Sequence, residues 1–150
     1  MGNDFTLSFW FRLANGVSAS SNGIIAGIGS TSSDGLSFSV INYKPECNFE
    51  GTKSLSGFSM EVDEWYNIVM VKKESVVHFY IDGSYIKGSN ENIGAAGSGT
   101  SDIFLGRSYD GTSYSYTGTS TNLSRVMVYT EALKASSLRQ NYLALRARYK

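Results

Sequence analysis

The sequence predicts an all-β fold: a two-sheet antiparallel jelly-roll sandwich with one short C-terminal helix. Three observations support this prediction. Apolar residues alternate at period two in many short segments, turn-forming residues are frequent, and helical periodicity appears only near the end. The 150 residues include 16 glycines and one proline, and 41% are hydrophobic, which suits a folded globule with one substantial core. We therefore expect residues 1–150 to form a single domain.

Short alternating segments predict strands in order along the chain. In the first, Phe5–Arg12, four apolar side chains share one face and Trp10 makes the opposite face partly apolar, so we expect both faces to be covered. Further strands are expected at Gly23–Gly29, Leu36–Tyr43, Trp65–Lys72, Val76–Asp82, Tyr85–Lys87, Ile103–Gly106 and Leu123–Tyr129. Leu55–Met60 is a strand candidate with a less regular pattern, and Pro45 marks an edge or a turn. So many short strands favour two stacked sheets.

Two turn signals connect the central strands. The polar linker Lys73–Ser75 has the length and composition of a hairpin loop between the strands that flank it. Asp82 and Gly83 form the Asp-Gly pair that is typical of a tight turn, and they lead into the next short strand. Together the two turns predict a three-stranded meander.

The hydrophobic period changes only near the C-terminus. Leu138, Tyr142 and Leu145 recur at spacings of four and three, which predicts an amphipathic helix over Lys134–Arg146. Lys134 stands where a Ser or Thr cap is common, so we expect the start of this helix to be poorly capped.

Charge, cysteine content and hydropathy exclude several classes of function. Thirteen basic and thirteen acidic residues cancel, so the chain lacks the basic surface of a nucleic-acid binder and we expect no nucleic-acid partner. The single cysteine, Cys47, offers no intrachain disulfide and no thiolate metal site. No apolar run approaches the ~18 residues of a membrane span, so we expect neither a span nor a signal peptide in this sequence. A short basic group is expected to be solvated: Arg139, Arg146, Arg148 and Lys150.

Three stretches together resemble one known family. They are Phe5–Phe11, which reads FTLSFWF, Trp65–Val71 followed by Tyr80–Gly83, which read WYNIVMV and YIDG, and a closing segment from Asn122 to Tyr142. In this order and spacing they are similar to the laminin G-like branch of the concanavalin A-like lectin/glucanase superfamily, and the resemblance covers most of the chain. It implies a concanavalin A-like sandwich. The ending Asn141–Tyr149 is also similar to endings of such domains in phage and large-virus structural proteins.

The sequence departs from the family pattern at several points, among them its start, Asn67, Lys134 and Thr121, where the family usually has a glycine. The family usually opens with an additional strand, whereas here the chain starts almost at the following one, so we expect the domain to be trimmed of its first strand or to receive that strand from a neighbour. Asn67 stands where the family often has a histidine.

We do not expect a hydrolytic site. The glucanase members carry a Glu-x-Asp-x-Glu strand, on one face of which two carboxylates about 5 Å apart flank the scissile bond. In the nearest match here, Glu61 and Asp63 share parity but Glu64 falls on the other face. His78 is the sole histidine, so a histidine metal cluster is not expected, and we interpret it as an ordinary strand residue. The sequence therefore predicts that the protein is not an enzyme.

Tyrosines in a predicted loop are the natural candidates for sugar recognition. Gly, Ser, Thr and Tyr dominate Tyr109–Thr121, which we expect to be a long loop. A tyrosine ring packs against the C–H face of a pyranose, while a neighbouring carboxylate holds its hydroxyl groups. The candidate ligand-binding residues are Tyr109, Asp110, Tyr114 and Tyr116. An equally favoured alternative is that Tyr114 and Tyr116 begin an edge strand and pack at its rim.

Calcium is left open as a cofactor. The resemblance implies that relatives bind it through loop carboxylates and backbone carbonyls, and Asp102 and Asp110 are the candidate ligands in this sequence. No pair of acidic residues has a spacing that defines a site, so solvated loop carboxylates are the alternative.

These features leave two functions. The first is a non-catalytic module of a viral or phage structural protein, in capsid decoration or in a tail or fibre appendage, which mediates surface attachment or packs against neighbouring virion subunits. The alternative is a glycan-binding, lectin-like domain of a secreted or cell-surface adhesin. The expected partner is therefore a glycan or a neighbouring structural subunit, with a homo-oligomer left open. The expected location is the virion or the extracellular space.

Overall fold

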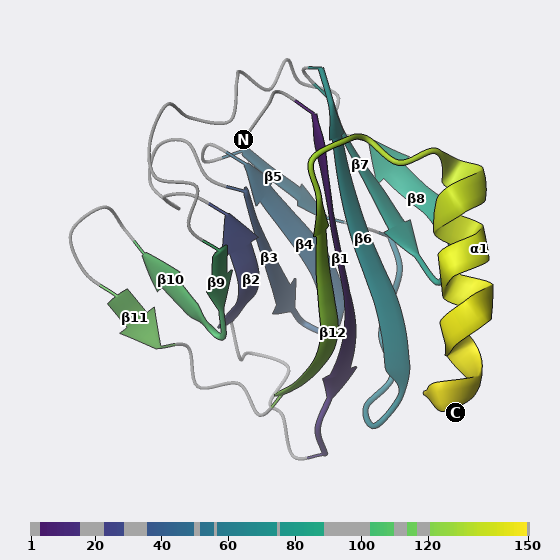
Figure 1. Cartoon of the computed structure of the whole chain (residues 1–150). Helices are drawn as coiled ribbons and strands as arrows, with labels where there is room; N and C mark the ends of the chain where they lie inside the picture. Colours follow the sequence, from purple (N-terminus) through teal and green to yellow (C-terminus); the bar gives the residue numbers. More distant parts are fainter. Residues whose placement is uncertain are drawn as a thin grey trace. The chain divides into compact units, whose positions relative to one another are not determined.

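A computed structural model describes residues 4–15, 23–28, 36–49, 52–55, 57–74, 76–88, 103–109, 114–116 and 121–149 (Figure 1). The chain divides into two units that interleave along the sequence. Unit 1 contains Met1–Asn15, Glu61–Asn92 and Thr121–Lys150, and unit 2 contains Gly16–Met60 and Ile93–Ser120.

The described residues are mostly strands. Unit 1 holds β1 (Phe5–Leu13), β6 (Trp65–Lys73), β7 (Val76–Ile81), β8 (Ser84–Gly88), β12 (Thr121–Tyr129), the helix α1 (Ala135–Leu145) and the 3-10 helix η1 (Arg146–Arg148). Unit 2 holds β2 (Gly23–Ile28), β3 (Leu36–Ile41), β4 (Lys44–Phe49), β5 (Thr52–Leu55), β9 (Ile103–Leu105), β10 (Arg107–Tyr109) and β11 (Tyr114–Tyr116). The all-β prediction with a single C-terminal α-helix is confirmed.

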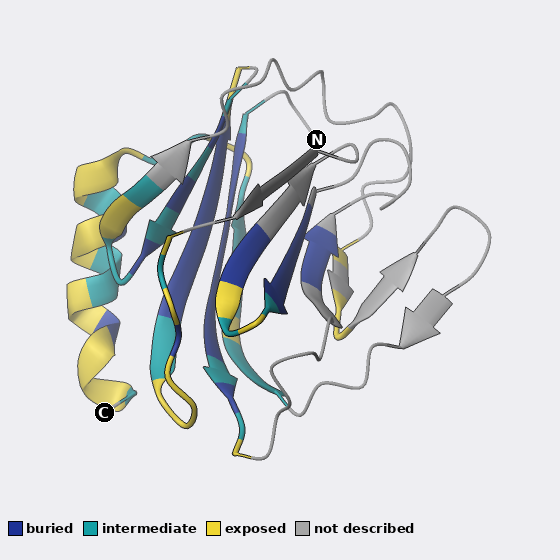
Figure 2. Ribbon diagram, turned by 180° about the vertical axis from the view of Figure 1, so that it is seen from behind, coloured by how far each residue is buried: buried dark blue, intermediate teal, exposed yellow. Residues whose placement is uncertain are grey.

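The framework of unit 1 is a five-stranded antiparallel sheet in the order β12-β1-β6-β7-β8. One face of β1 carries four apolar side chains that are each at most 1% exposed: Phe5, Leu7, Phe9 and Phe11. The opposite face is buried as well, because Thr6, Ser8 and Trp10 are 5% exposed or less. The prediction that both faces of this strand are covered is therefore confirmed, and Figure 2 shows the burial along the sheet.

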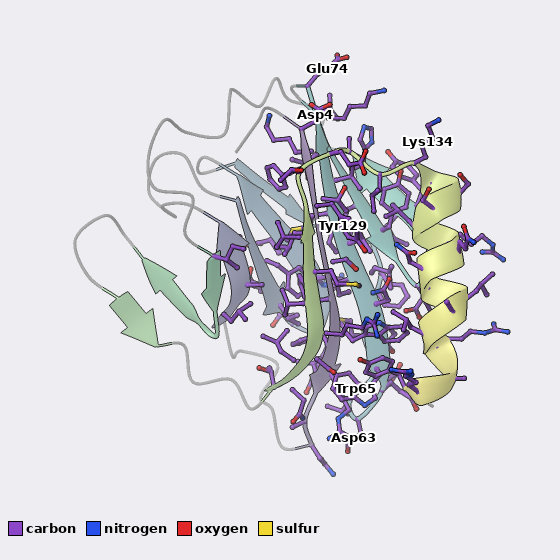
Figure 3. The ribbon with its side chains drawn as sticks, viewed as in Figure 1. Asp4, Asp63, Trp65, Glu74, Tyr129 and Lys134 are labelled. Atoms are coloured by element: carbon purple, nitrogen blue, oxygen red, sulfur yellow. The ribbon has the colours of Figure 1, made fainter. Side chains whose placement is uncertain are left out.

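The predicted meander β6-β7-β8 is present. The β6–β7 turn is tied to the start of β1, because the Glu74 N–H donates to Asp4 Oδ1 at 2.7 Å (Figure 3). At the β7–β8 turn, Asp82 and Gly83 have φ values of 52° and 71°, as the two-residue type I′ turn requires. This turn places Ile81 opposite Ser84 and fixes the register of the pair.

Asn67 and Asp82 hold the β7–β8 turn against β6. The Asn67 N–H donates to Asp82 Oδ1 at 2.8 Å, and the Asp82 N–H donates back to the Asn67 carbonyl at 2.9 Å. Burial raises the pKa of the Asp82 carboxyl, and the hydrogen bond from Asn67 opposes this effect. The Asn67 side chain, where the resembling family often has histidine, donates to Ser8 Oγ at 3.3 Å.

The helix α1 packs on the outer face of this sheet, the face that carries Thr6 and Trp10. Lys134 occupies the N-cap position without a side-chain cap hydrogen bond, so the predicted poor cap is confirmed. Leu138 packs with Val69 and Val71 of β6, and all three are 3% exposed or less. The helix is therefore held by packing against β6.

A buried hydroxyl fixes the connection from β12 into α1. Thr6 Oγ1 donates to the Glu131 carbonyl at 2.9 Å and accepts from the Leu133 N–H at 3.0 Å. Thr6 itself is fully buried, so its hydroxyl has little competition from water. One strand side chain thus satisfies two backbone groups that precede the helix.

Aromatic rings pack where the chain leaves η1. Tyr149 stacks on Trp10 at 4.0 Å between ring centroids and meets Trp65 edge-on at 5.2 Å. Tyr142 stacks on the same Trp10 at 5.8 Å, and the Arg12 guanidinium lies 5.4 Å from the Trp65 ring centroid. Within the described part of the chain, Trp10 Nε1 finds no hydrogen-bond acceptor. These contacts anchor the C-terminal segment to β1.

The second five-stranded antiparallel sheet, in unit 2, has the order β5-β4-β3-β2-β9. Pro45 lies near the start of β4, opposite Val40, just before β4 begins to pair with β5 at Glu46. A proline is tolerated there because its missing N–H falls outside the ladder with β5. The Leu55–Met60 strand prediction is confirmed at Leu55, which ends β5, and is wrong at residues 57–60, which form no strand. Of these, Met60 is 2% exposed, and its N–H donates to the Tyr43 carbonyl at 2.8 Å.

In the residues that the structure describes, no helix has the length and apolar character needed to cross a membrane.

Candidate functional site

The sequence-predicted tyrosines lie on a short hairpin in unit 2. β10 and β11 pair antiparallel, with Tyr109 opposite Tyr114 and Arg107 opposite Tyr116. The expectation of a loop over Tyr109–Thr121 is therefore wrong at Tyr109, at Tyr114–Tyr116 and at Thr121, all of which lie on strands, whereas the alternative that placed Tyr114 and Tyr116 on a strand is confirmed. Tyrosine and serine fit an extended backbone, so three-residue strands form even between turn-rich segments.

The register decides which hairpin positions share a face. Residues directly opposite each other in an antiparallel pair lie on the same face, as do residues two apart on one strand. Positions 107, 109, 114 and 116 therefore share one face of the hairpin, and positions 108 and 115 share the other. We call the first set the tyrosine face. It contains three of the four predicted binding positions and adds Arg107, which joins the set because it pairs with Tyr116.

The remaining predicted site residues, Asp102 and Asp110, lie outside the described residues. Among the residues that are described, no group of three or more His, Cys, Asp or Glu side chains is arranged to hold a metal ion. The calcium site at Asp102 and Asp110 stays a prediction.

A second group of aromatic side chains lies on unit 1, at the β8 edge of its sheet. Tyr85 of β8 is 57% exposed. It meets Tyr80 edge-on, with 5.5 Å between ring centroids, and lies 6.1 Å from the ring of His78 at a tilt of 52°. We call His78, Tyr80 and Tyr85 the edge cluster.

Burial across the sheet explains why the edge cluster is accessible. On the outer face, Val69 and Val71 of β6 are buried beneath α1. The next strand, β7, carries the half-buried His78 and Tyr80, and Tyr85 on β8 is largely exposed. The helix therefore leaves this end of the sheet only partly covered: it meets the β7–β8 turn at Gly83, but the Tyr85 side chain stays largely exposed.

The type I′ turn at Asp82 and Gly83 brings the two tyrosines together. With two turn residues, Tyr80 and Tyr85 become direct cross-strand partners. Gly83 also lies against the helix, because a Cβ there would be 3.1 Å from Arg139 Cα and 3.3 Å from Tyr142 Cβ. This cluster was not predicted from the sequence. The signal was present in the order Tyr80-Ile81-Asp82-Gly83-Ser84-Tyr85, since a predicted I′ turn fixes which residues are paired.

The carboxylates considered for hydrolysis lie before β6 and not on a strand. Glu61, Asp63 and Glu64 are exposed, and Asp63 has a positive φ of 63° within a turn. The Asp63 N–H donates to the Leu13 carbonyl at 2.7 Å, so this turn is fastened to the end of β1 (Figure 3). The Glu61 N–H donates to the Tyr66 hydroxyl at 2.9 Å, and burial raises the pKa of Tyr66. Hydrogen bonds of this segment thus hold the end of β1 near the start of β6.

Comparison with known proteins gives a family and a fold. A laminin G-type family model, described as the concanavalin A-like lectin/glucanases superfamily, matches residues 1–139. No curated protein sequence matches.

Solved structures share the fold at low sequence identity. A mutant sialidase of Trypanosoma rangeli with trans-sialidase activity is 19% identical, with a TM-score of 0.75 over 95% of this chain and 23% of that chain. A candidate carbohydrate-binding protein of Bacteroides ovatus is 17% identical, with a TM-score of 0.74 over 94% of this chain and 41% of that chain. The binding domain of botulinum neurotoxin serotype D is 11% identical, with a TM-score of 0.73 over 96% of this chain and 36% of that chain.

These matches establish the fold class, and in each case the chain spans less than half the length of the matching structure. The resemblance read from Phe5–Phe11 and from the Trp65–Gly83 hairpins is confirmed by the family match, which covers both regions. The chain belongs to the concanavalin A-like lectin/glucanases superfamily.

Proposed function

We propose that this protein is a non-catalytic carbohydrate-binding module and that the tyrosine face of the β10–β11 hairpin contacts the sugar. The observation that carries the proposal is the hairpin register, which gathers positions 109, 114 and 116 on one face. Tyrosines combine apolar ring surface with a hydroxyl at low entropic cost, and this combination suits the two faces of a pyranose ring.

The structural neighbours support a binding role. Among them are a candidate carbohydrate-binding protein, the receptor-binding domain of botulinum neurotoxin type G and a sialidase in complex with sialic acid. At identities of 13 to 19% these names transfer no residue and no ligand to this chain. They make glycan binding the function to test first.

A non-catalytic role agrees with the disposition of the acidic residues. Glu61, Asp63 and Glu64 are solvent-exposed around a turn, where no shared strand face positions two of them across a bond. His78 lies on β7 within the edge cluster. We propose that the chain binds its ligand without transforming it.

A glycan array printed with neutral and acidic oligosaccharides tests the proposal, with the full chain applied in calcium and again in EDTA. We expect Tyr114→Ala to lose at least about 90% of the signal, since it removes the buried apolar area of the ring as well as an aromatic contact worth about 0.5–1.5 kcal/mol, and each 1.4 kcal/mol is tenfold in affinity. Ser115→Ala is the matched control, because position 115 lies on the opposite face of the same strand. A blank array for the wild-type chain, or equal loss in both variants, would refute the assignment. Loss of binding in EDTA would support the predicted calcium site.

The second candidate function is subunit packing in a viral or phage structural protein. It is favoured by β9, an edge strand of the unit 2 sheet on which Ile103 is 40% exposed and Leu105 is 47% exposed. Exposed apolar side chains on a sheet edge are typical of surfaces that meet another chain. Light scattering should then show multimers that Leu105→Lys dissociates, whereas a monomer at high micromolar concentration would count against this role. Either function places the protein in the virion or the extracellular space, and we propose that location.

A further inference from the structure

We propose that the edge cluster is a second saccharide-binding platform, on which the ring of Tyr85 stacks against a neutral pyranose. The proposal takes its ligand class from the carbohydrate-binding function proposed above, but its residues are independent of the β10–β11 hairpin. His78, Tyr80 and Tyr85 belong to unit 1, whereas the hairpin belongs to unit 2.

The Tyr85 ring is exposed yet held on two sides. Tyr80 contacts it edge-on from the directly opposite position on β7, and His78 lies against it from two residues away. Tyr80 in turn packs against Leu138 and the β6 valines beneath the helix. A ring fixed in this way loses little conformational freedom when a ligand stacks on it, which is the physical requirement for a sugar platform.

The polar groups of the cluster suit hydroxyl recognition. Two phenol hydroxyls and one imidazole offer both donors and acceptors. Burial, with a smaller contribution from Tyr85, raises the pKa of Tyr80, so its phenol stays neutral at physiological pH. The residue opposite His78 on β8 is Gly88, which has no side chain to cover the imidazole from that strand. Because the cluster contains no carboxylate and no lysine or arginine, a neutral sugar fits it better than a charged one.

Size and edge geometry argue against a protein partner at this position. Three aromatic side chains, at about 150–250 Å² each, provide less area than the roughly 800 Å² that each partner buries in a stable protein interface. Strand addition at β8 is also disfavoured. Phe79 pairs with Lys87 and Tyr80 with Tyr85, so Ile86 is an extra residue that forms a bulge in the edge strand. A single sugar ring needs neither the area nor a regular edge.

The test is an NMR titration of the full isotope-labelled chain with methyl glycosides of glucose, galactose, mannose and N-acetylglucosamine. We expect at least one of these glycosides to shift the His78 ring signals and the amides of Ser84 and Tyr85. Tyr85→Ala should weaken this binding at least about tenfold, because it removes the stacking ring, while Tyr85→Phe should stay within about threefold. Leu143→Ala is the control, since it removes an exposed apolar side chain of α1 outside the cluster. Tyr85→Leu retains apolar area without a ring and should bind as poorly as Tyr85→Ala.

The outcomes separate this inference from the proposed function. Equal affinity in wild type, Tyr85→Ala and Tyr85→Leu, or shifts confined to residues of the hairpin, would overturn the edge platform and leave carbohydrate binding intact. A wild-type chain that binds no glycoside and gives a blank array would overturn both proposals. Tyr114→Ala should leave the glycoside-induced shifts of the His78 ring signals unchanged. If Tyr114→Ala weakened glycoside binding at the edge cluster as much as Tyr85→Ala does, the two platforms would not be independent.

Discussion

Gly83→Ala measures how closely the helix approaches the β7–β8 turn. Alanine at φ 71° must adopt the left-handed region, which costs about 1–2 kcal/mol. Its Cβ would also lie 3.1 Å from Arg139 Cα and 3.3 Å from Tyr142 Cβ. Because the first of these atoms is helix backbone, α1 must shift, and overpacking of this kind costs about 1–3 kcal/mol. We expect a total loss of about 2–5 kcal/mol in unfolding free energy, measured by urea unfolding.

Two other glycines separate the two causes. Gly106 has a similar φ of 69° but nothing within 4 Å of its Cβ position, so Gly106→Ala should show only the backbone cost of about 1–2 kcal/mol. Gly57 has neither a positive φ nor a near neighbour, so Gly57→Ala should change stability by less than about 0.5 kcal/mol. If Gly83→Ala lowers the unfolding free energy no more than Gly106→Ala does, the inference that α1 packs closely against the turn is wrong.

Three further perturbations test the contacts of unit 1. Thr6→Val should cost about 1–3 kcal/mol in urea unfolding, because the partly buried Leu133 N–H loses its acceptor, while Thr6→Ser should retain most of the stability; equal losses would contradict the role of the Thr6 hydroxyl. Tyr149→Ala removes the stack on Trp10 and should destabilise the chain by about 1–3 kcal/mol and shift tryptophan fluorescence toward the red; an unchanged spectrum would refute the stack. Burial raises the folded pKa of Asp82 above its unfolded value, so its contribution to stability is present at pH below the unfolded pKa and is lost as pH rises through the folded pKa. Asp82→Asn should therefore be neutral or stabilising at pH 7, an advantage that disappears below about pH 4, the ordinary aspartate pKa; a constant difference across the pH range would contradict it.

Local pairing was predictable from the sequence, and short or irregular segments were not. The β6-β7-β8 meander could be predicted because each strand is joined to the next by a turn whose residues specify its geometry, as at Asp82 and Gly83. The strand at Tyr114–Tyr116 was one of two open alternatives, and its pairing with Tyr109 was not predicted, because a three-residue strand gives too few alternations to define a period. The opposite error occurred at Met60, which was predicted to end a strand. Met60 is buried without strand pairing, and the sequence pattern does not distinguish these two cases.

The candidate surfaces differ in what the sequence reveals of them. The tyrosine face could be anticipated from composition, because its tyrosines are close in the chain, although Arg107 joins them only through the register. The edge cluster depends on two further facts, the pairing of Tyr80 with Tyr85 and the exposure of Tyr85 that the helix packing leaves. The second fact is tertiary, and no local pattern in the sequence encodes it.

The position of α1 links stability to the edge cluster. Tyr80 has the Leu138 cluster on one side and the Tyr85 ring on the other, so the order of the exposed ring derives from the helix packing. β8 alone is a five-residue edge strand with a bulge, which gives weak support to an exposed side chain. Because Gly83 sets how closely α1 approaches the same turn, a change there should disturb both the helix and the platform. By linkage, a ligand that binds only the ordered ring must stabilise the docked helix in return.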